Sequence, residues 1–146
     1  MATERHYLCN ECNTKQWIDS LFDALYSFSN KKIQRCNSCN KDMEFQLIFN
    51  FGLGAGRFPS KVLAAYLPEE IRKWPNDNTM IEFYPFLVIT KSIKEGNTSA
   101  WLPYWHIVKK NDQVIERKYG QWAPFIDTEC YNSLLLKAKK QGFLEI

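Results

Sequence analysis

The chain has 146 residues, which is enough for one domain or for a small module joined to a larger one. Hydrophobic residues make up 45% of it, and ten Phe, seven Tyr and five Trp supply enough apolar surface for a packed core, which excludes an intrinsically disordered chain. The net charge is +3, and residues 1–50 carry six basic and six acidic side chains, so the composition lacks the strongly basic segment of most obligate nucleic-acid binders.

Neither a membrane span nor a secretory signal is expected. No stretch approaches the run of about eighteen or more apolar residues that a span requires, and the opening MATERHYLCNEC lacks the apolar segment of a signal peptide. We therefore expect a soluble protein of the cytoplasm. Four of its five cysteines fall in two C-x-x-C pairs, and in a reducing compartment such pairs favour a metal site over disulfides.

The predicted elements begin around CNECN at residues 9–13. RHYLC before it and KQW after it have the pattern of two short strands that flank a tight turn. The next segment, WIDSLFDALYSFSN, predicts a helix of about two to three turns, which Asp19 or Ser20 can cap. Its apolar residues at helical spacing are Ile18, Leu21, Phe22, Leu25 and Phe28.

A second knuckle, CNSCN at residues 36–40, precedes a predicted strand in DMEFQLIFNFG. Apolar and more polar residues alternate in this strand, which predicts one buried face. The apolar ones are Met43, Phe45, Leu47 and Phe49. The glycine-rich segment GLGAGRFPS follows, and we place a boundary there between a zinc-ribbon-like module with four cysteines at 1–50 and an α+β domain at 51–146.

Two short helices are predicted over about residues 60–74. SKVLAAYLP has an apolar stripe at helical spacing and ends at Pro68. PEEIRKWP begins with a proline, carries two acids in its first turn and ends at Pro75.

Strands are predicted over about residues 80–119. The segments MIEFYPFLVITKSI, AWLPYWHIVKK and QVIERKYG are rich in aromatic and β-branched residues, and Asn111 with Asp112 suits a hairpin turn. Pro85 restricts its strand to an edge or a bulge. We expect these strands to form one antiparallel sheet.

A helix over about residues 128–141 has the clearest start and stop signals. Asp127 or Thr128 can cap its start, three lysines complement the negative end of its dipole, and Gly142 ends it. The predicted class is α+β: a four-cysteine module with a helical insert, then an antiparallel sheet with short helices and a C-terminal helix. The last helix has an apolar stripe that we expect to be buried, formed by Cys130, Tyr131, Leu134, Leu135 and Ala138.

The four paired cysteines follow the pattern C-x2-C-x23-C-x2-C, which gives two chelating pairs that can close a tetrahedron at metal–sulfur distances of about 2.3 Å. They are Cys9, Cys12, Cys36 and Cys39. Asn13 and Asn40 follow the two pairs, and Asn is the non-glycine residue that best tolerates the left-handed backbone such a turn often requires. We predict a structural zinc ion because no coordination position is left open. Iron, which accepts the same ligands, and free or disulfide-bonded thiols are the alternatives.

These residues resemble the zinc-ribbon and rubredoxin-like knuckle proteins, in which two such turns at the ends of β-hairpins face one metal. The resemblance covers residues 6–50, about a third of the chain. Those families usually have Gly where this chain has Asn13 and Asn40, and a plain ribbon needs a shorter insert, so a treble-clef-like variant is also open. The remainder of the chain resembles no family.

A glycine-rich loop and a lone arginine are candidates for a second site. Gly52, Gly54 and Gly56 precede Arg57, and their amides could cradle an anion or contribute to an enzyme's site. A hinge or a close-packed turn has the same pattern and is the preferred interpretation.

Cys130 and His106 could pair as a nucleophile and a base. The position of Cys130 on the apolar stripe of the last helix favours a packing role instead. His6 precedes the first knuckle and suits either a second layer around the metal or the surface.

Aromatic residues gather in residues 101–122, with cations close by in sequence. A sheet face that presents aromatics beside cations can stack unpaired RNA or DNA bases, whereas aromatics on strands more often belong to the core. Trp122, in a loop with Gly and Pro, is the one most expected outside the core. The aromatics are Trp101, Tyr104, Trp105, Tyr119 and Trp122, and the cations are Lys109, Lys110, Arg117 and Lys118.

Three functions follow, in order of preference. The first is a zinc-binding interaction protein, an adaptor or regulator that meets a protein partner through the loop of Trp122. The second is binding of RNA or single-stranded DNA through strands 101–122. The third is an enzyme of unknown reaction near the Gly52–Arg57 loop.

Overall fold

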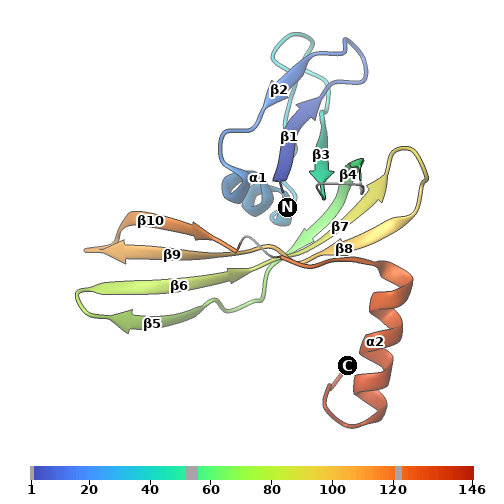
Figure 1. Cartoon of the computed structure of the whole chain (residues 1–146). Coiled ribbons are helices and arrows are strands. Elements are labelled where there is room, and N and C mark those ends of the chain that lie inside the picture. The colour runs from blue at the N-terminus through green and yellow to red at the C-terminus, as the bar shows by residue number, and fades with distance from the viewer. Residues whose placement is uncertain (1, 52–55, 121–122) are drawn as a thin grey trace.

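The structure is a computed structural model that describes residues 2–51, 56–120 and 123–146. The described residues form two antiparallel sheets and two helices, α1 (Leu21–Ser29) and α2 (Thr128–Lys140), as the α+β class predicts (Figure 1). The larger sheet has seven strands in the order β11-β8-β7-β4-β3-β1-β2, and the smaller has four in the order β10-β9-β6-β5.

The strand bounds are as follows. The larger sheet contains β1 (Ala2–Leu8), β2 (Lys15–Trp17), β3 (Glu44–Asn50), β4 (Arg57–Tyr66), β7 (Leu87–Ser92), β8 (Thr98–Trp101) and β11 (Phe125–Asp127). The smaller sheet contains β5 (Arg72–Asn76), β6 (Thr79–Pro85), β9 (Tyr104–Lys110) and β10 (Gln113–Tyr119).

The first third of the chain folds as its local signals predict. β1 and β2 flank the first knuckle, and α1 begins at Ser20, whose hydroxyl accepts a hydrogen bond from the Asp23 amide at 3.2 Å. β3 alternates as predicted, and its inward residues belong to the same core cluster as the apolar stripe of α1. These core residues are Ile18, Leu21, Leu25, Phe45, Leu47 and Phe49.

The larger sheet continues through the predicted module boundary. β3 pairs with β4 in an antiparallel ladder that joins Leu47 to Ser60 and Phe49 to Phe58. Strands from both sides of residue 51 therefore share one sheet.

The two helices predicted over residues 60–74 are wrong, because this segment forms β4 and β5. The ladder between β4 and β7 shifts register between Val62 and Ala64, which inserts an extra residue into β4. As a result Val62 and Ala65 are both buried while Leu63 is exposed. The two buried residues are three positions apart, which is a spacing also found on one face of a helix. β5 is an edge strand, which is a position that tolerates Pro75.

The single sheet predicted over residues 80–119 is also wrong, because two long segments change sheets at prolines. β6 ends at Pro85 and the chain enters the larger sheet as β7, while β8 ends before Pro103 and the chain enters the smaller sheet as β9. The Phe86 amide donates to the Pro103 carbonyl at 2.9 Å and joins the two crossings. Asn111 and Asp112, with φ of 52° and 63°, form the predicted hairpin between β9 and β10.

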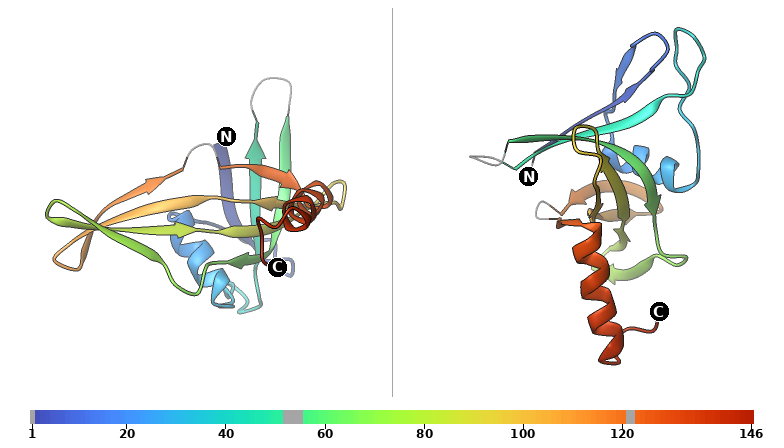
Figure 2. Two further views of the ribbon diagram at one scale, coloured as in Figure 1. Left: turned by 90° about the horizontal axis from the view of Figure 1, so that it is seen from below. Right: turned by 90° about the vertical axis from the view of Figure 1, so that its right-hand side faces the viewer.

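The C-terminal helix forms where predicted, but its apolar stripe is not buried. All of α2 lies within the described residues, none of its residues is buried, and Cys130 is exposed. α2 is tied to the larger sheet at its first residue, where the Thr128 and Thr98 hydroxyls lie 2.6 Å apart, and it then projects away from the body (Figures 1 and 2). The expectation of a packed Cys130 is therefore wrong, because no residue of the stripe is buried. Among the described residues, neither helix has the length and apolar character to cross a membrane.

Glu82 is a buried carboxylate in β6 that two lysines neutralise. Lys109 Nζ lies 2.9 Å from one carboxylate oxygen and Lys73 Nζ lies 3.0 Å from the other, and the Tyr84 hydroxyl donates to Glu82 at 3.0 Å. Burial alone raises the pKa of Glu82, but the two ammonium groups and the hydroxyl outweigh burial and hold that pKa below its usual value. The cluster ties β5, β6 and β9 together.

We expect Glu82→Gln to lower the free energy of unfolding at pH 7 by about 2 kcal/mol, because both lysines lose their charged partner. The pKa of Glu82 is lower in the folded chain than in the unfolded one, so its stabilisation is present above the unfolded-state pKa and is lost as pH falls through the folded-state pKa. Urea unfolding of both proteins at neutral and acid pH should show the difference shrinking in acid. The exposed Glu116→Gln is the control and should change stability by less than about 0.5 kcal/mol; an equally large difference at both pH values would contradict the role of the ionised carboxylate.

Candidate metal centre

Both cysteine knuckles have the same backbone geometry. In the first, the Asn13 amide donates to the Cys9 carbonyl at 2.8 Å, and in the second the Asn40 amide donates to the Cys36 carbonyl at 2.9 Å. Asn13 and Asn40 have φ of 59° and 60°, as predicted from their place after each pair. The turn between β1 and β2 forms the first knuckle, and the bridge between Arg35 and Asp42 closes the second.

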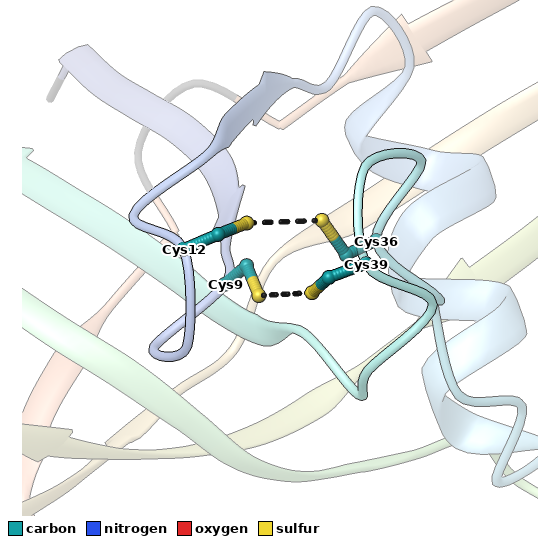
Figure 3. Close-up of side chains that lie close together, drawn as sticks. All are labelled: Cys9, Cys12, Cys36 and Cys39. Atoms are coloured by element: carbon teal, nitrogen blue, oxygen red, sulfur yellow. Dashed lines mark hydrogen bonds between the residues drawn. The ribbon is translucent and has the colours of Figure 1, made fainter.

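The four cysteine sulfurs converge from the two knuckles (Figure 3). All four Sγ atoms lie within 4.8 Å of one another, with Cys9 Sγ 3.4 Å from Cys39 Sγ and Cys12 Sγ 3.6 Å from Cys36 Sγ. A tetrahedron with metal–sulfur distances of about 2.3 Å has sulfur–sulfur edges of about 3.8 Å, so the cluster has the size of a four-thiolate site. The thiols are free. The four cysteines can therefore hold one metal ion.

Hydrogen bonds from the knuckle backbone favour thiolates. The amides of Cys39 and then Ser38 lower the pKa of Cys36 to about 6, and the Thr14 hydroxyl and amide lower the pKa of Cys12. At Cys39 the Lys41 amide lowers the pKa, but the hydrogen bond with Cys9 and desolvation outweigh it and raise the pKa to about 12. A divalent cation can replace the protons of these thiols because its charge stabilises each thiolate.

The cluster lies at the outer end of the first hairpin with one side packed and one side open. Cys9 and Cys36 are buried against Met43 and Tyr7, while Cys12 and Cys39 lie at the surface. Two polar contacts also join the knuckles to the opposite elements: the Asn37 amide donates to Gln16 Oε1 at 3.3 Å, and Asn10 Nδ2 donates to Glu44 Oε2 at 3.0 Å.

No family model, curated protein or solved structure matches this chain.

His6 is buried in β1 and is not a surface residue. Its Nε2 lies 3.1 Å from Gln46 Oε1, and its ring meets the edge of Trp17 at 5.5 Å between centroids. Burial lowers the pKa of His6, so the imidazole is held neutral and links β1 to β3.

Some of the aromatic residues predicted to form a stacking surface lie in the core, and others lie outside it. Trp101 and Trp105 are buried in the core and cannot stack on a ligand, which corrects their place among the candidates. Tyr119 is half-buried, with its hydroxyl enclosed and its ring 4.9 Å from that of Trp105. Tyr104 and Lys118 reach the outer side of the smaller sheet. Trp122 lies outside the described residues.

The glycine loop gives no described site. Gly52 and Gly54 lie outside the described residues, and Gly56 has φ of 76°. Arg57 Nη2 is 2.6 Å from Glu4 Oε2, so its guanidinium already has an anionic partner.

His106 and Cys130 do not come together. The rings around His106 are those of Trp74, Phe83 and Tyr104, and Cys130 is on α2, outside that group.

The sequence analysis named Tyr104 and His106 but missed the two aromatics beside them, Trp74 and Phe83. Trp74, Phe83, Tyr104 and His106, here called the outer aromatic patch, lie together on the smaller sheet. The assignment of RKWP to a helix concealed Trp74. The available signal was the two-residue spacing of Arg72 and Trp74, which is a strand period.

We expect Asn40→Val to lower the free energy of unfolding of the metal-loaded protein by roughly 1–2 kcal/mol, because a β-branched residue tolerates φ of 60° poorly. Asn40→Gly is the matched control and should stay within about 0.5 kcal/mol of the natural chain, since glycine adopts this backbone freely. Chemical unfolding measures both. Equal losses for Val and Gly would show that the asparagine side chain, and not the backbone, matters.

Proposed function

We propose that the four cysteines bind one structural zinc ion, which holds the two knuckles together, and that the protein presents α2 to a protein partner. The observation that carries the second part is the exposure of α2: none of its residues is buried, and Leu134, on its apolar stripe, is 57% exposed. Monomeric proteins rarely expose an apolar helix face of this kind without a partner for it.

Four thiolates in two symmetrical knuckles support zinc in a closed site. The protein supplies every ligand, so no position remains for a substrate, and the ion's role is to hold the two knuckles together. Iron accepts the same four sulfurs, and elemental analysis of the purified protein distinguishes the two metals. The buried cluster around the knuckles is small, with Met43 and Tyr7 beside Cys9 and Cys36, so its stability depends on the ion.

The arrangement supports the zinc-ribbon-like interpretation of residues 6–50. One knuckle ends a β-hairpin, the other is closed by a bridge between Arg35 and Asp42, and both face one cluster. α1 forms the helical insert between the pairs. Free thiols and thiolate ligands persist in a reducing compartment, which supports the proposed cytoplasmic location.

We expect Cys36→Ser to reduce bound zinc from about one ion per chain to less than a tenth of that, because a hydroxyl is a poor replacement for a thiolate. Hydrogen exchange should then rise across residues 6–50, where the packed knuckle cluster lies. Elemental analysis and hydrogen exchange measure the two effects. Cys130→Ser is the control and should keep the metal and the protection, since Cys130 is exposed on α2. Full metal content in Cys36→Ser would refute the four-thiolate site.

α2 has the pattern of a helix that lies in a groove. Its stripe of apolar residues recurs at positions i, i+3, i+4 and i+7, which is the spacing by which helices anchor in apolar grooves. The stripe consists of Tyr131, Leu134, Leu135 and Ala138. The helix is stable as a projecting element because Asp127 caps its start, with its carboxylate accepting from the Glu129 amide at 3.0 Å, and Gly142 closes its end at φ of 81°.

The charges on α2 indicate the kind of partner. Its last turn carries the exposed Lys137, Lys139 and Lys140, and its first turn carries only Glu129 as an acid. A groove with an apolar floor and an acidic rim is complementary to this surface. The occupant that we propose is therefore a different protein with such a groove, and a second copy of this chain is the competing occupant.

We expect Leu134→Asp to leave the thermal unfolding temperature within about 2 °C of the natural chain, because its side chain is exposed, and to weaken partner binding at least about tenfold. Sedimentation first tests for self-association. A photo-cross-linking residue at position 134 then captures the partner, and titration of the purified pair gives the Kd for each variant. Ser133→Asp, at an exposed position outside the stripe, is the control. Self-association through α2, or equal affinity for the natural chain and Leu134→Asp, would overturn the proposal.

A further inference from the structure

The smaller sheet has two unlike faces. The face toward α1 packs Tyr84 and Trp105 against Phe22, with ring centroids 5.0 and 5.7 Å apart. Successive strand residues point to opposite faces, so Phe83, Tyr104 and His106 point away from α1. Figure 1 shows α1 on one side of this sheet only, and the left view of Figure 2 looks onto the other side.

The outer aromatic patch is organised around His106. The Phe83 ring is nearly parallel to it at 5.2 Å, while Trp74 and Tyr104 present their rings at 80° and 79° to it, at 5.8 and 5.9 Å. The ring contacts described for these four residues are all with one another. The patch is half-buried, and an open depression of about 420 Å³ lies between Trp74, Phe83, His106 and Arg72.

The backbone fixes one of these rings. A Cβ atom at Gly120 would collide with the ring of Tyr104, so the ring lies directly over the glycine backbone. The Gly120 amide also donates to the Tyr104 carbonyl at 2.9 Å. A ring held in this way loses little side-chain freedom when a ligand stacks on it.

Two cations lie at the ends of one row across the sheet. Arg72 pairs with Phe83, Phe83 with His106 and His106 with Lys118, so the row reads cation, aromatic, imidazole, cation. With neighbouring strands about 4.8 Å apart, the row spans about 14 Å. Within the described part of the chain Arg72 has no ion pair, and Lys118 has only the exposed Glu116 at 3.7 Å, a contact that contributes little.

We propose that this face binds single-stranded nucleic acid, with bases stacked on the outer aromatic patch and phosphates on Arg72 and Lys118. Base stacking on aromatic side chains contributes on the order of 1–3 kcal/mol per base, and it requires bases that are free of a duplex. Cations at both ends of the row match an anionic chain longer than one nucleotide. The depression is open along the row, which suits a strand that passes through it.

This surface differs from the one predicted from sequence. Trp101 and Trp105, which we expected to stack bases, are core residues, and Trp74 and Phe83 from β5 and β6 take their place.

The test is fluorescence anisotropy of the full chain with labelled twelve-nucleotide oligouridine, oligoadenosine and oligodeoxythymidine at low ionic strength. We expect Trp74→Ala to weaken binding about tenfold, in line with the loss of one stacked base. Trp17→Ala removes an exposed tryptophan, 65% exposed on β2, and is the matched control that should bind as the natural chain does. Replacing both Arg72 and Lys118 by Gln should reduce the slope of log K against log salt by about 0.7 for each lost phosphate contact.

Two further experiments distinguish binding of a nucleic-acid strand from binding of a single nucleotide. Uridine and adenosine monophosphate should compete at least about a hundredfold more weakly than the oligomers, since they occupy one base position and lack a second phosphate. If Trp74→Ala does not fold, ultraviolet cross-linking of 4-thiouridine oligomers to the natural chain replaces it, with cross-links expected in β5, β6 and β9. Any of four results would overturn the proposal. None of the three oligomers binds, or the folded Trp74→Ala chain binds them as tightly as the natural chain does. Alternatively, the mononucleotides bind as tightly as the oligomers, or the cross-links are confined to other elements.

Discussion

The contact of two turns twenty-seven residues apart is the constraint on which the front of the molecule depends. Four sulfurs within 4.8 Å can be held there as thiolates only if a cation offsets their charge. The same contact fixes where β1, β2 and the second knuckle end, and β1 in turn pairs with β3 along its whole length. The cysteine cluster is thus at one end of a continuous ladder that leads through β4 to the rest of the sheet.

The parts that could be predicted from sequence carry their signals locally. The cysteine spacing and the asparagine after each pair describe a turn that needs no distant partner, and φ of about 60° at Asn13 and Asn40 is the result. Ser20 caps α1 through an atom three residues away, and the alternation through Phe45, Leu47 and Phe49 is a property of one strand. Candidate metal ligands were found for the same reason.

The parts that could not be predicted depend on neighbours in space. The bulge in β4 gives Val62 and Ala65 a helical spacing, and only the ladder with β7 shows that the segment is a strand. The apolar stripe of α2 predicts that the helix has an apolar side. Whether that side is buried depends on which other elements of the fold pack against it. The outer aromatic patch could not be found from residues 101–122, because half of it comes from β5 and β6. The structure therefore transfers the predicted base-stacking role from Trp101 and Trp105 to the outer aromatic patch.

The paired crossings at Phe86 and Pro103 also determine how the two sheets can move. The chain passes from sheet to sheet four times, between β4 and β5, β6 and β7, β8 and β9, and β10 and β11. A hydrogen bond of 2.9 Å joins the second of these crossings to the third. Because four backbone segments connect the two sheets, rotation about one of them requires matching changes in the other three. The four-stranded sheet is therefore anchored through four backbone segments and not through a single hinge, so a load on its far edge is shared among all four crossings.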